Sequence, residues 1–183
     1  MTSKDLYILR FPIGEFQKPD TISSEMIHLW INDIERFPSE INKATKVLSK
    51  EQLNWTCRPD GWNIKQVVHH CADSHMHSII RFKLALTEDS PTIKPFYEDR
   101  WATLIDGNDD SLDDSLNVLR GIHNKLGQLL KHISEDELSR EFMHPDHLKR
   151  LRIDETIGMY AWHSNHHLAH IKQAITYEGH FKM

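Results

Sequence analysis

Residues 154–179 read DETIGMYAWHSNHHLAHIKQAITYEG, and this stretch has the pattern of a long helix with one apolar face. Its apolar residues recur at the spacing of an α-helix and do not alternate as they would in a strand. Asp154 is expected to cap the N-terminus, and Gly179 stands where the glycine that ends a helix belongs. The stretch therefore predicts a helix that packs into a bundle.

Four histidines lie close together in this helix: His163, His166, His167 and His170. At about 100° per residue, His163 and His167 lie beside the apolar face, whereas His166 and His170 turn toward the polar side. His163 and His167 are also one turn apart, a spacing that lets two imidazoles share a metal ion. A single histidine on a helix is more often an ordinary core or surface residue, so spacing alone leaves both interpretations open.

A catalytic zinc ion usually has three protein ligands, so a second helix must supply one more side chain. Residues 64–87 predict such a helix. In it His75 lies within the apolar arc, His70 at the flank of that arc and His69 on the far side, and angle alone does not separate His70 from His75. We favour His70, because its position mirrors that of His163 and a substrate can reach the edge of a crevice.

Two further long helices are predicted from apolar residues at helical spacing. One begins between Thr21 and Ser24 and continues or restarts after Pro38, where we expect a kink. The other is expected to start at the cap Ser111 and to run through Ile133. Four long helices indicate an all-α four-helix bundle, a fold in which facing helices build metal and ligand sites.

The chain is expected to form one domain over residues 1–183, a length that can bury a single core. Within it, Asn63 is predicted to cap the helix at 64–87. Residues 1–20 contain Pro12, Gly14 and Pro19 and are expected to form an extended arm laid over the bundle.

Composition excludes several classes of protein. The formal net charge is -5 and the 22 Lys and Arg residues are scattered among 27 Asp and Glu, so no basic stripe predicts binding to nucleic acid. No apolar run approaches about 20 residues, and the N-terminus lacks the pattern of a signal peptide. We therefore expect a cytoplasmic protein that does not enter a membrane. Cys57 and Cys71 are expected to be free thiols in a reducing compartment.

Three segments of the chain carry a resemblance to a known family. LRFPIGEF (9–16), RPDGWNIKQVVHHCADSHMHSIIRFKLALTEDSPTIKP (58–95) and YAWHSNHHLAHI (160–171) occur in the order and at the separations seen in the DinB/YfiT-like superfamily. The chain resembles the YfiT-type metal-dependent hydrolases of that superfamily over nearly its whole length. This resemblance implies a four-helix bundle, a homodimer, a cytoplasmic location, and zinc or sometimes nickel as the metal.

The resemblance also implies which residues bind the metal. The ligands of the family are the second histidine of an HH pair and an i, i+4 pair on the last helix, and these match His70, His163 and His167. The chain departs from the family pattern at Cys57, Asp60 and His77. His77 could serve as an extra ligand or as a partner of a ligand, which leaves the coordination number open.

A metal ion held by three neutral imidazoles keeps an open position and can activate water, so the first hypothesis is a hydrolase that acts on a small molecule. Candidates for its general base are Asp73, His77 and His166. An alternative is an S-transferase in which the metal activates a low-molecular-weight thiol, as in bacillithiol-transferase-like relatives. A third hypothesis is a bundle in which the metal only holds two helices together.

Overall fold

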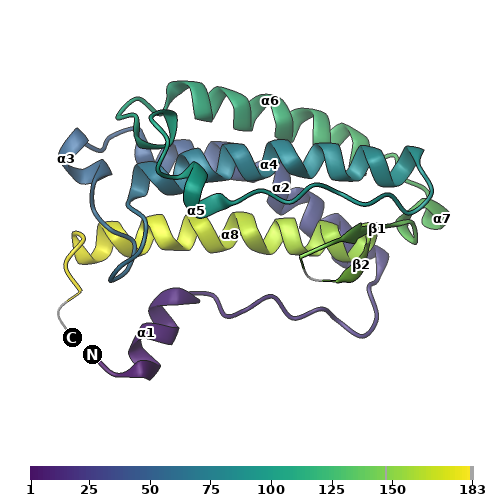
Figure 1. The fold of residues 1–183 in the computed structure, drawn as a ribbon, viewed down its shortest axis with the longest axis horizontal. Coiled ribbons are helices and arrows are strands. Elements are labelled where there is room, and N and C mark those ends of the chain that lie inside the picture. The colour runs from purple at the N-terminus through teal and green to yellow at the C-terminus, as the bar shows by residue number, and fades with distance from the viewer. Residues whose placement is uncertain (147, 182–183) are drawn as a thin grey trace.

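The computed structural model describes residues 1–146 and 148–181, and the chain forms a four-helix bundle (Figure 1). This confirms the fold class predicted from the sequence. The four long helices are α2 (Ser24–Thr45), α4 (Ile64–Thr87), α6 (Asp113–Leu130) and α8 (Ile153–Tyr177).

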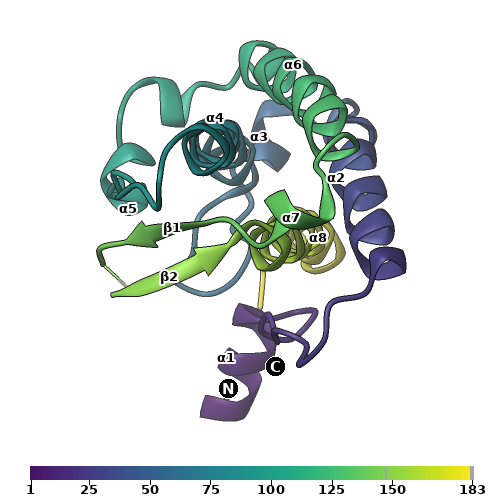
Figure 2. The same ribbon diagram turned by 90° about the vertical axis from the view of Figure 1, so that its right-hand side faces the viewer.

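The order of the helices around the bundle differs from their order in the sequence. Helix α2 packs against α6 and α8, and α4 also packs against α6 and α8. Figures 1 and 2 show that the chain crosses over the bundle between α4 and α6, and that these two helices run in the same direction. Helix α8 runs in the opposite direction beside α4, so these two helices form an antiparallel pair.

Short elements fill the connections between the long helices. The segment between α7 and α8 forms a hairpin in which Glu141 pairs with Arg152. Alternate residues of its first strand, Phe142 and His144, are buried, which is the pattern of a half-buried strand. The short elements are α3 (Lys50–Leu53), α5 (Glu98–Trp101), η1 (Asp106–Asn108), α7 (Glu135–Leu138), β1 (Glu141–His144) and β2 (Lys149–Arg152).

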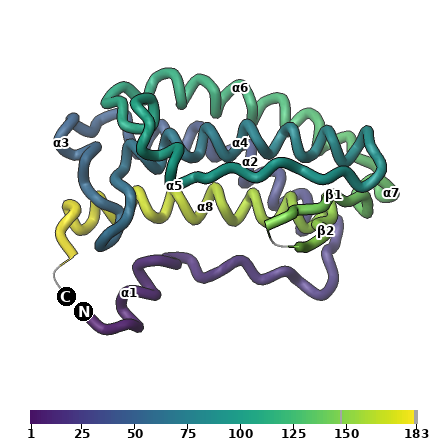
Figure 3. The backbone as a smooth tube through the Cα atoms, viewed as in Figure 1, coloured from purple at the N-terminus to yellow at the C-terminus, as the bar shows by residue number. Residues whose placement is uncertain are grey.

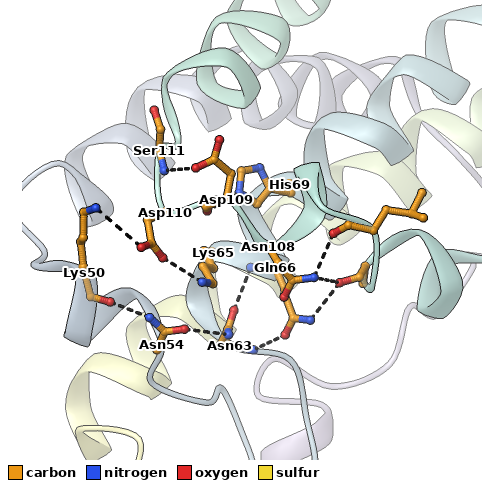
Figure 4. Close-up of polar contacts among 12 residues, drawn as sticks. Lys50, Asn54, Asn63, Lys65, Gln66, His69, Asn108, Asp109, Asp110 and Ser111 are labelled. Carbon is orange, nitrogen blue, oxygen red and sulfur yellow. Dashed lines mark hydrogen bonds and ion pairs between the residues drawn. The ribbon is translucent and has the colours of Figure 1, made fainter.

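The N-terminus of α4 is held by polar contacts with the crossover connection (Figure 4). Asn63 and Gln66 form the capping box that starts the helix, so the predicted cap is confirmed. Lys65 forms an ion pair with Asp110 at 2.8 Å, and Gln66 donates to the carbonyl of Ala102 at 3.0 Å. These contacts attach the start of α4 to the segment that leads into α6.

Two predicted helix caps are wrong. Leu112 and not Ser111 is the N-cap of α6, and the backbone N–H of Ser111 donates to Asp109. Helix α8 begins one residue before Asp154, whose carboxylate accepts from Arg152 at 2.7 Å and lies inside the first turn. The other end of α8 agrees with the sequence, because Gly179 follows the helix with a positive φ of 69°.

The N-terminal arm is partly helical. Helix α1 (Ser3–Arg10) starts at a capping box formed by Thr2 and Asp5, so the expectation of an extended arm over residues 1–20 is wrong for its first half. Residues 11–20 contain no helix or strand. A helix of eight residues is too short for apolar spacing to mark it in the sequence, and a local cap decides its start.

The arm lies along α8, as Figure 3 shows. The indole N–H of Trp162 donates to the carbonyl of Gly14 at 3.0 Å, and Gln173 donates to the carbonyl of Leu9 at 3.0 Å. The arm therefore covers the histidine-rich helix on the side away from the bundle core.

Helix α2 continues through Pro38 without ending there. Proline has no N–H to donate to the carbonyl four residues earlier, which here belongs to Ile34. That carbonyl accepts instead from the side chain of His123 on α6 at 2.5 Å. The proline thus supplies a buried acceptor in the centre of the bundle.

The core of the bundle has two apolar regions with a polar layer between them. One apolar cluster contains Val67, Cys71 and Ile171, and the other contains Phe82 and Ile157. The polar layer is made of buried residues of α4, α6 and α8: His70, Ser74, His75, Ser78, Arg81, His123, Ser164 and His167. Among the described residues, no helix has both the length and the hydrophobicity needed to cross a membrane.

Candidate metal centre

Three histidines from two helices meet at one side of the polar layer. His70 of α4 and His163 and His167 of α8 each offer one ring nitrogen, and these three nitrogens lie within 4.8 Å of one another. The Nε2 atoms of His70 and His163 are 3.4 Å apart. The structure therefore brings together the three residues that the resemblance implies as ligands, and they are the one such group found in the described part of the chain.

The helix geometry explains how these rings meet. His163 and His167 are one turn apart on α8, and their ring centroids are separated by 4.4 Å. The antiparallel neighbour α4 places the ring of His70 at 5.4 Å from His163 and 4.9 Å from His167. The indole of Trp62 packs against His70 at 4.6 Å and limits its movement.

The three rings are neutral at pH 7. Burial lowers the pKa of His70 to about 4. Burial lowers the pKa of His163 and His167 well below 6.5, and the neighbouring histidines lower it further. Neutral imidazole offers a lone pair, and three such donors suit a divalent cation of the zinc type. The residues present therefore fit a metal ion.

A chain of hydrogen bonds connects one of these rings to the far side of the bundle. His163 Nδ1 lies 3.0 Å from His75 Nε2, and His75 Nδ1 lies 2.6 Å from His123 Nε2. His123 Nδ1 then lies 2.5 Å from the carbonyl oxygen of Ile34, which Pro38 leaves without its helical donor. The chain thus crosses from α8 through α4 and α6 to α2.

The carbonyl oxygen fixes the direction of every hydrogen bond in this chain. A carbonyl can only accept, so His123 carries its proton on Nδ1. Burial lowers the pKa of His123 to about 4 and that of His75 well below 6.5, so both rings are neutral. Each then accepts at Nε2 and donates from Nδ1. The last member, His163, donates from Nδ1, and its Nε2 faces His70 with a lone pair.

His75 therefore differs from His70, although their helical angles could not separate them. His75 is almost completely buried, at 1% exposed, and both of its ring nitrogens are bonded to other histidines. It lies behind His163 and is absent from the group of possible ligands.

Three further histidines lie outside this group. Both ring nitrogens of His69 are bonded, one to Ser115 at 2.8 Å and the other to the carbonyl of Asp109 at 3.0 Å. His170 bonds the carbonyl of Arg10 in the arm at 3.2 Å. His166 stacks on Trp162 at 4.5 Å and lines the cavity described below.

A cavity of about 610 Å³ opens beside the three histidines. This volume suits a small organic molecule. Its described walls come from α4, α8, the arm, the loop at residues 57–62, the segment before α5, α5 itself and the β-hairpin, and they include His70, His163 and His167. A ligand in the cavity would therefore lie directly against the three rings.

Two of the predicted general bases lie elsewhere. Of Asp73, His77 and His166, His166 alone is among the described residues that line the cavity. Burial and the nearby charge of Asp106 raise the pKa of Asp73 to about 6. His77 stacks on Phe96 at 4.3 Å, its Nδ1 bonds the carbonyl of Asp73, and it is absent from the group of possible ligands.

Sequence reasoning did not single out His123 or Arg81. His123 stands between Leu119 and Leu126 on the apolar stripe of α6, and a polar residue in such a stripe signals a buried network. Arg81 shares the face of His70 on α4, but its buried position in the cavity wall depends on the tertiary structure.

Comparison with known proteins identifies relatives of this chain. The family model described as DinB superfamily matches residues 33–171. Proteins named "Putative metal-dependent hydrolase" from Bacillus cereus and Bacillus anthracis are each 47% identical over 163 residues, which cover 89% of this chain and 93% of theirs. The structure of YfiT from Bacillus subtilis is similar with a TM-score of 0.91 and 39% identity, covering 94% of this chain and 98% of that one. Its description is a probable metal-dependent hydrolase with an unusual four-helix bundle topology.

Proposed function

The chain belongs to the DinB superfamily, and from this premise we propose that it is a metal-dependent hydrolase of a small molecule. His70, His163 and His167 hold the metal ion in this proposal, and zinc is the metal that three imidazoles suit best, with nickel as a second possibility. The observation that carries the proposal is the approach of three neutral rings at the wall of a cavity large enough for a substrate.

Three protein ligands leave at least one position of a tetrahedral ion open, and such an ion acidifies bound water and polarises a carbonyl group. Neighbouring side chains orient the ligands and shield the site from water. His75 and His123 orient the ring of His163 and keep its Nε2 unprotonated. Trp62 and Phe96 stand beside His70 and exclude water from one side of the site.

His166 is the residue best placed to move a proton in the cavity. Its Nδ1 is buried and has no hydrogen-bond partner among the described residues. Burial, followed by the charges of His170 and Arg58, lowers its pKa to about 4, so the ring is a proton acceptor at pH 7. Substitution His166→Gln should therefore lower kcat and leave the metal content unchanged.

One observation favours a second candidate function, thiol S-transfer. The cavity has no buried carboxylate among its described lining residues, because Asp60, Glu98, Asp99 and Asp146 are all exposed. Hydrolysis commonly uses a general base for water, and without a buried carboxylate this role would fall on His166, whereas a metal can bind a thiolate without any such base. A low-molecular-weight thiol is therefore the alternative co-substrate.

The two functions can be separated by their need for a thiol. Zinc-loaded protein is incubated with a panel of activated esters, and separately with an alkyl or aryl halide with and without small thiols. Ester turnover without thiol supports the hydrolase. Turnover that occurs only when thiol is present removes the hydrolase proposal and leaves the transferase.

A purely structural metal is a third possibility, and it makes a different prediction. The visible spectrum of cobalt-substituted protein should shift when azide or a thiol is added, because these ligands enter an open position. A spectrum that does not respond to either ligand would mean that the metal only joins α4 to α8.

A further inference from the structure

Arg81 lies buried in the cavity wall without an acidic partner. Arg81 is 9% exposed, and it forms no ion pair with any described residue. Its Nη1 donates a hydrogen bond to the phenol oxygen of Tyr160 at 2.9 Å, and its buried Nε has no partner in the described structure. Guanidinium remains charged at any pH at which the protein is folded, so this site holds an uncompensated positive charge.

An isolated buried charge is costly, and proteins normally pair it with an opposite charge. The acidic residues that line the cavity do not do so, because Asp60, Glu98, Asp99 and Asp146 are exposed and form no ion pair with Arg81. Of the Arg, Asp and Glu residues described as lining the cavity, Arg81 alone is buried, and its charge is positive. A negative group on a ligand would supply the missing partner.

The position of Arg81 links it to the three histidines. Eleven residues, about three turns of helix, separate His70 from Arg81, so both side chains leave the same face of α4. On α8 the partner of Arg81 is Tyr160, which precedes His163 by one turn. Long helical side chains lean toward the N-terminus, which turns Arg81 toward His70. All four residues line the same cavity.

The hydrogen bond to Tyr160 selects the shape of the ligand group. It occupies Nη1. The other edge of the guanidinium has two parallel N–H groups, on Nη2 and on the buried Nε, and neither has a partner among the described residues. A planar carboxylate matches such an edge with its two oxygens, and its single charge balances the single guanidinium charge.

We infer that the substrate carries a carboxylate that pairs with Arg81, while its reacting group lies against His70, His163 and His167. This inference rests on the proposed function, because it assigns the substrate class of the same site. Arg81 and Tyr160 would hold the carboxylate, and the distance between it and the reacting group would select substrates by length.

A series of hydroxamates tests the inference by binding and not by turnover. A hydroxamate group binds a divalent ion through two oxygens, and its alkyl chain is made to end in either a carboxylate or an uncharged carboxamide. Dissociation constants are measured by calorimetry on zinc-loaded protein for several chain lengths. At the best length the carboxylate should bind about 10 to 100 times more tightly than the carboxamide, as a charge-assisted hydrogen bond predicts.

Variants assign this preference to one residue. Arg81→Gln should bring the two hydroxamates to within about two-fold of each other, because a charge-assisted hydrogen bond is lost. Arg58→Gln is the matched control, since Arg58 also lines the cavity but is only half-buried and bonds the carbonyl of Pro59. This control should keep the full preference. Melting curves show that each variant is folded, and the wild-type comparison is informative without any variant.

The outcomes separate the inference from the proposed function. Equal binding of both hydroxamates to the wild-type protein at every length would overturn the inference and keep the open metal position. A preference that survives Arg81→Gln, or that Arg58→Gln removes, would also overturn it. If no hydroxamate binds, the open position is absent and the proposed function fails.

A second measurement tests Arg81 without any metal. Metal-free protein labelled with ¹⁵N is titrated with pentanoate and with pentanamide, and the Nε–H signal of Arg81 is followed by NMR. The signal is identified by its loss in Arg81→Lys. Pentanoate should shift it downfield and pentanamide should not. A signal that neither compound moves at high millimolar concentration would overturn the inference, independently of whether the protein binds a metal ion.

Discussion

At the scale of single residues, the three candidate ligands and their neighbours differ in what their ring nitrogens contact. His163 and His167 direct nitrogens toward His70, whereas His170 bonds the arm and His69 bonds the crossover connection. The site therefore depends on which nitrogens are available and not on how many histidines the helix contains.

The first prediction concerns the ligands themselves. His163→Ala or His167→Ala should abolish stoichiometric metal binding, because two remaining imidazoles hold zinc far more weakly than three. His170→Ala is the matched control on the same helix and should keep one metal per chain. Elemental analysis of untagged protein measures this. Full metal content in His163→Ala would show that the ion lies elsewhere.

The second prediction concerns His123, which touches no ligand directly. His123→Phe keeps the volume of the ring and removes the donor to Ile34 and the acceptor for His75. Zinc affinity should fall about 10 to 100-fold, the usual effect of losing an outer partner of a metal-binding histidine.

His123→Gln should recover part of this affinity, since an amide can both donate and accept. A structural role alone would not change the tautomer of His163, which ¹⁵N NMR of the ring reports. Protonation of His163 at Nδ1 in the wild type and a mixture of tautomers in His123→Phe is the expected result. Unchanged affinity and tautomer would show that His123 only fills space.

The helical period predicted some of these residues and not others. It placed His163 and His167 beside the apolar face, and the structure brings both to His70. It placed His166 and His170 toward the polar side, but both are 7% exposed, because the N-terminal arm lies along α8 and bonds His170. It could not choose between His70 and His75, since an angle gives the direction of a side chain and not its depth in the bundle. The depth follows from α6, which places His123 behind His75.

At the scale of elements, Pro38 couples the backbone of α2 to the site. A proline inside a helix costs about 3 kcal/mol relative to alanine when nothing compensates. Here the freed carbonyl of Ile34 accepts from His123, so part of the cost is offset by a buried hydrogen bond.

The third prediction follows from this coupling. Pro38→Ala restores a backbone N–H that competes with His123 for the carbonyl of Ile34. Zinc affinity should fall several-fold, while the free energy of unfolding of metal-free protein should stay the same or rise by up to about 3 kcal/mol. Chelator competition and urea denaturation measure the two quantities. Ser39→Ala, at the next and exposed position of α2, is the control and should leave affinity unchanged.

Helix boundaries were predicted where the capping group has no competing partner. Asn63 caps α4 because, within the described part of the chain, its side chain forms hydrogen bonds with Gln66 and Asn54 and no competing ion pair. Asp154 fails as a cap because Arg152 binds its carboxylate. The sequence did not predict the β-hairpin, since each of its strands has four residues and β1 gains a bridge from Thr92 in a distant connection.

At the scale of the whole molecule, the bundle places a polar layer between two apolar clusters. Burial removes the histidines of this layer from water, which costs free energy that the packing of the apolar clusters must offset. A metal ion that binds only the folded chain would add stability by mass action.

The fourth prediction is the pH dependence of the metal-free protein. Burial lowers the pKa of His70 and His123 to about 4, compared with about 6.5 in an unfolded chain. Between these values the unfolded chain binds more protons than the folded one. The contribution of these neutral histidines to the free energy of unfolding is therefore fully present above about pH 6.5 and is lost as the pH falls toward 4.

Asp73 has the opposite effect on folding stability. Its pKa is raised to about 6, so its protonated, neutral form stabilises the folded protein as the pH falls. The melting temperature of metal-free protein should nevertheless fall between pH 6.5 and 4, since several histidines oppose one carboxyl. Asp73→Asn should steepen this fall. A melting temperature that is constant or rises as the pH is lowered through this range would contradict the neutral, buried state of the histidines.

The central claim is that side chains of α4 and α8 hold one divalent ion and leave part of its coordination open. The most direct test is an anomalous difference map from crystals of the zinc-loaded protein. The expected result is one peak per chain at about 2.0–2.1 Å from a nitrogen of each of His70, His163 and His167, with a non-protein ligand completing the coordination. A peak at another place, or a fourth protein side chain bound to the ion, would contradict it.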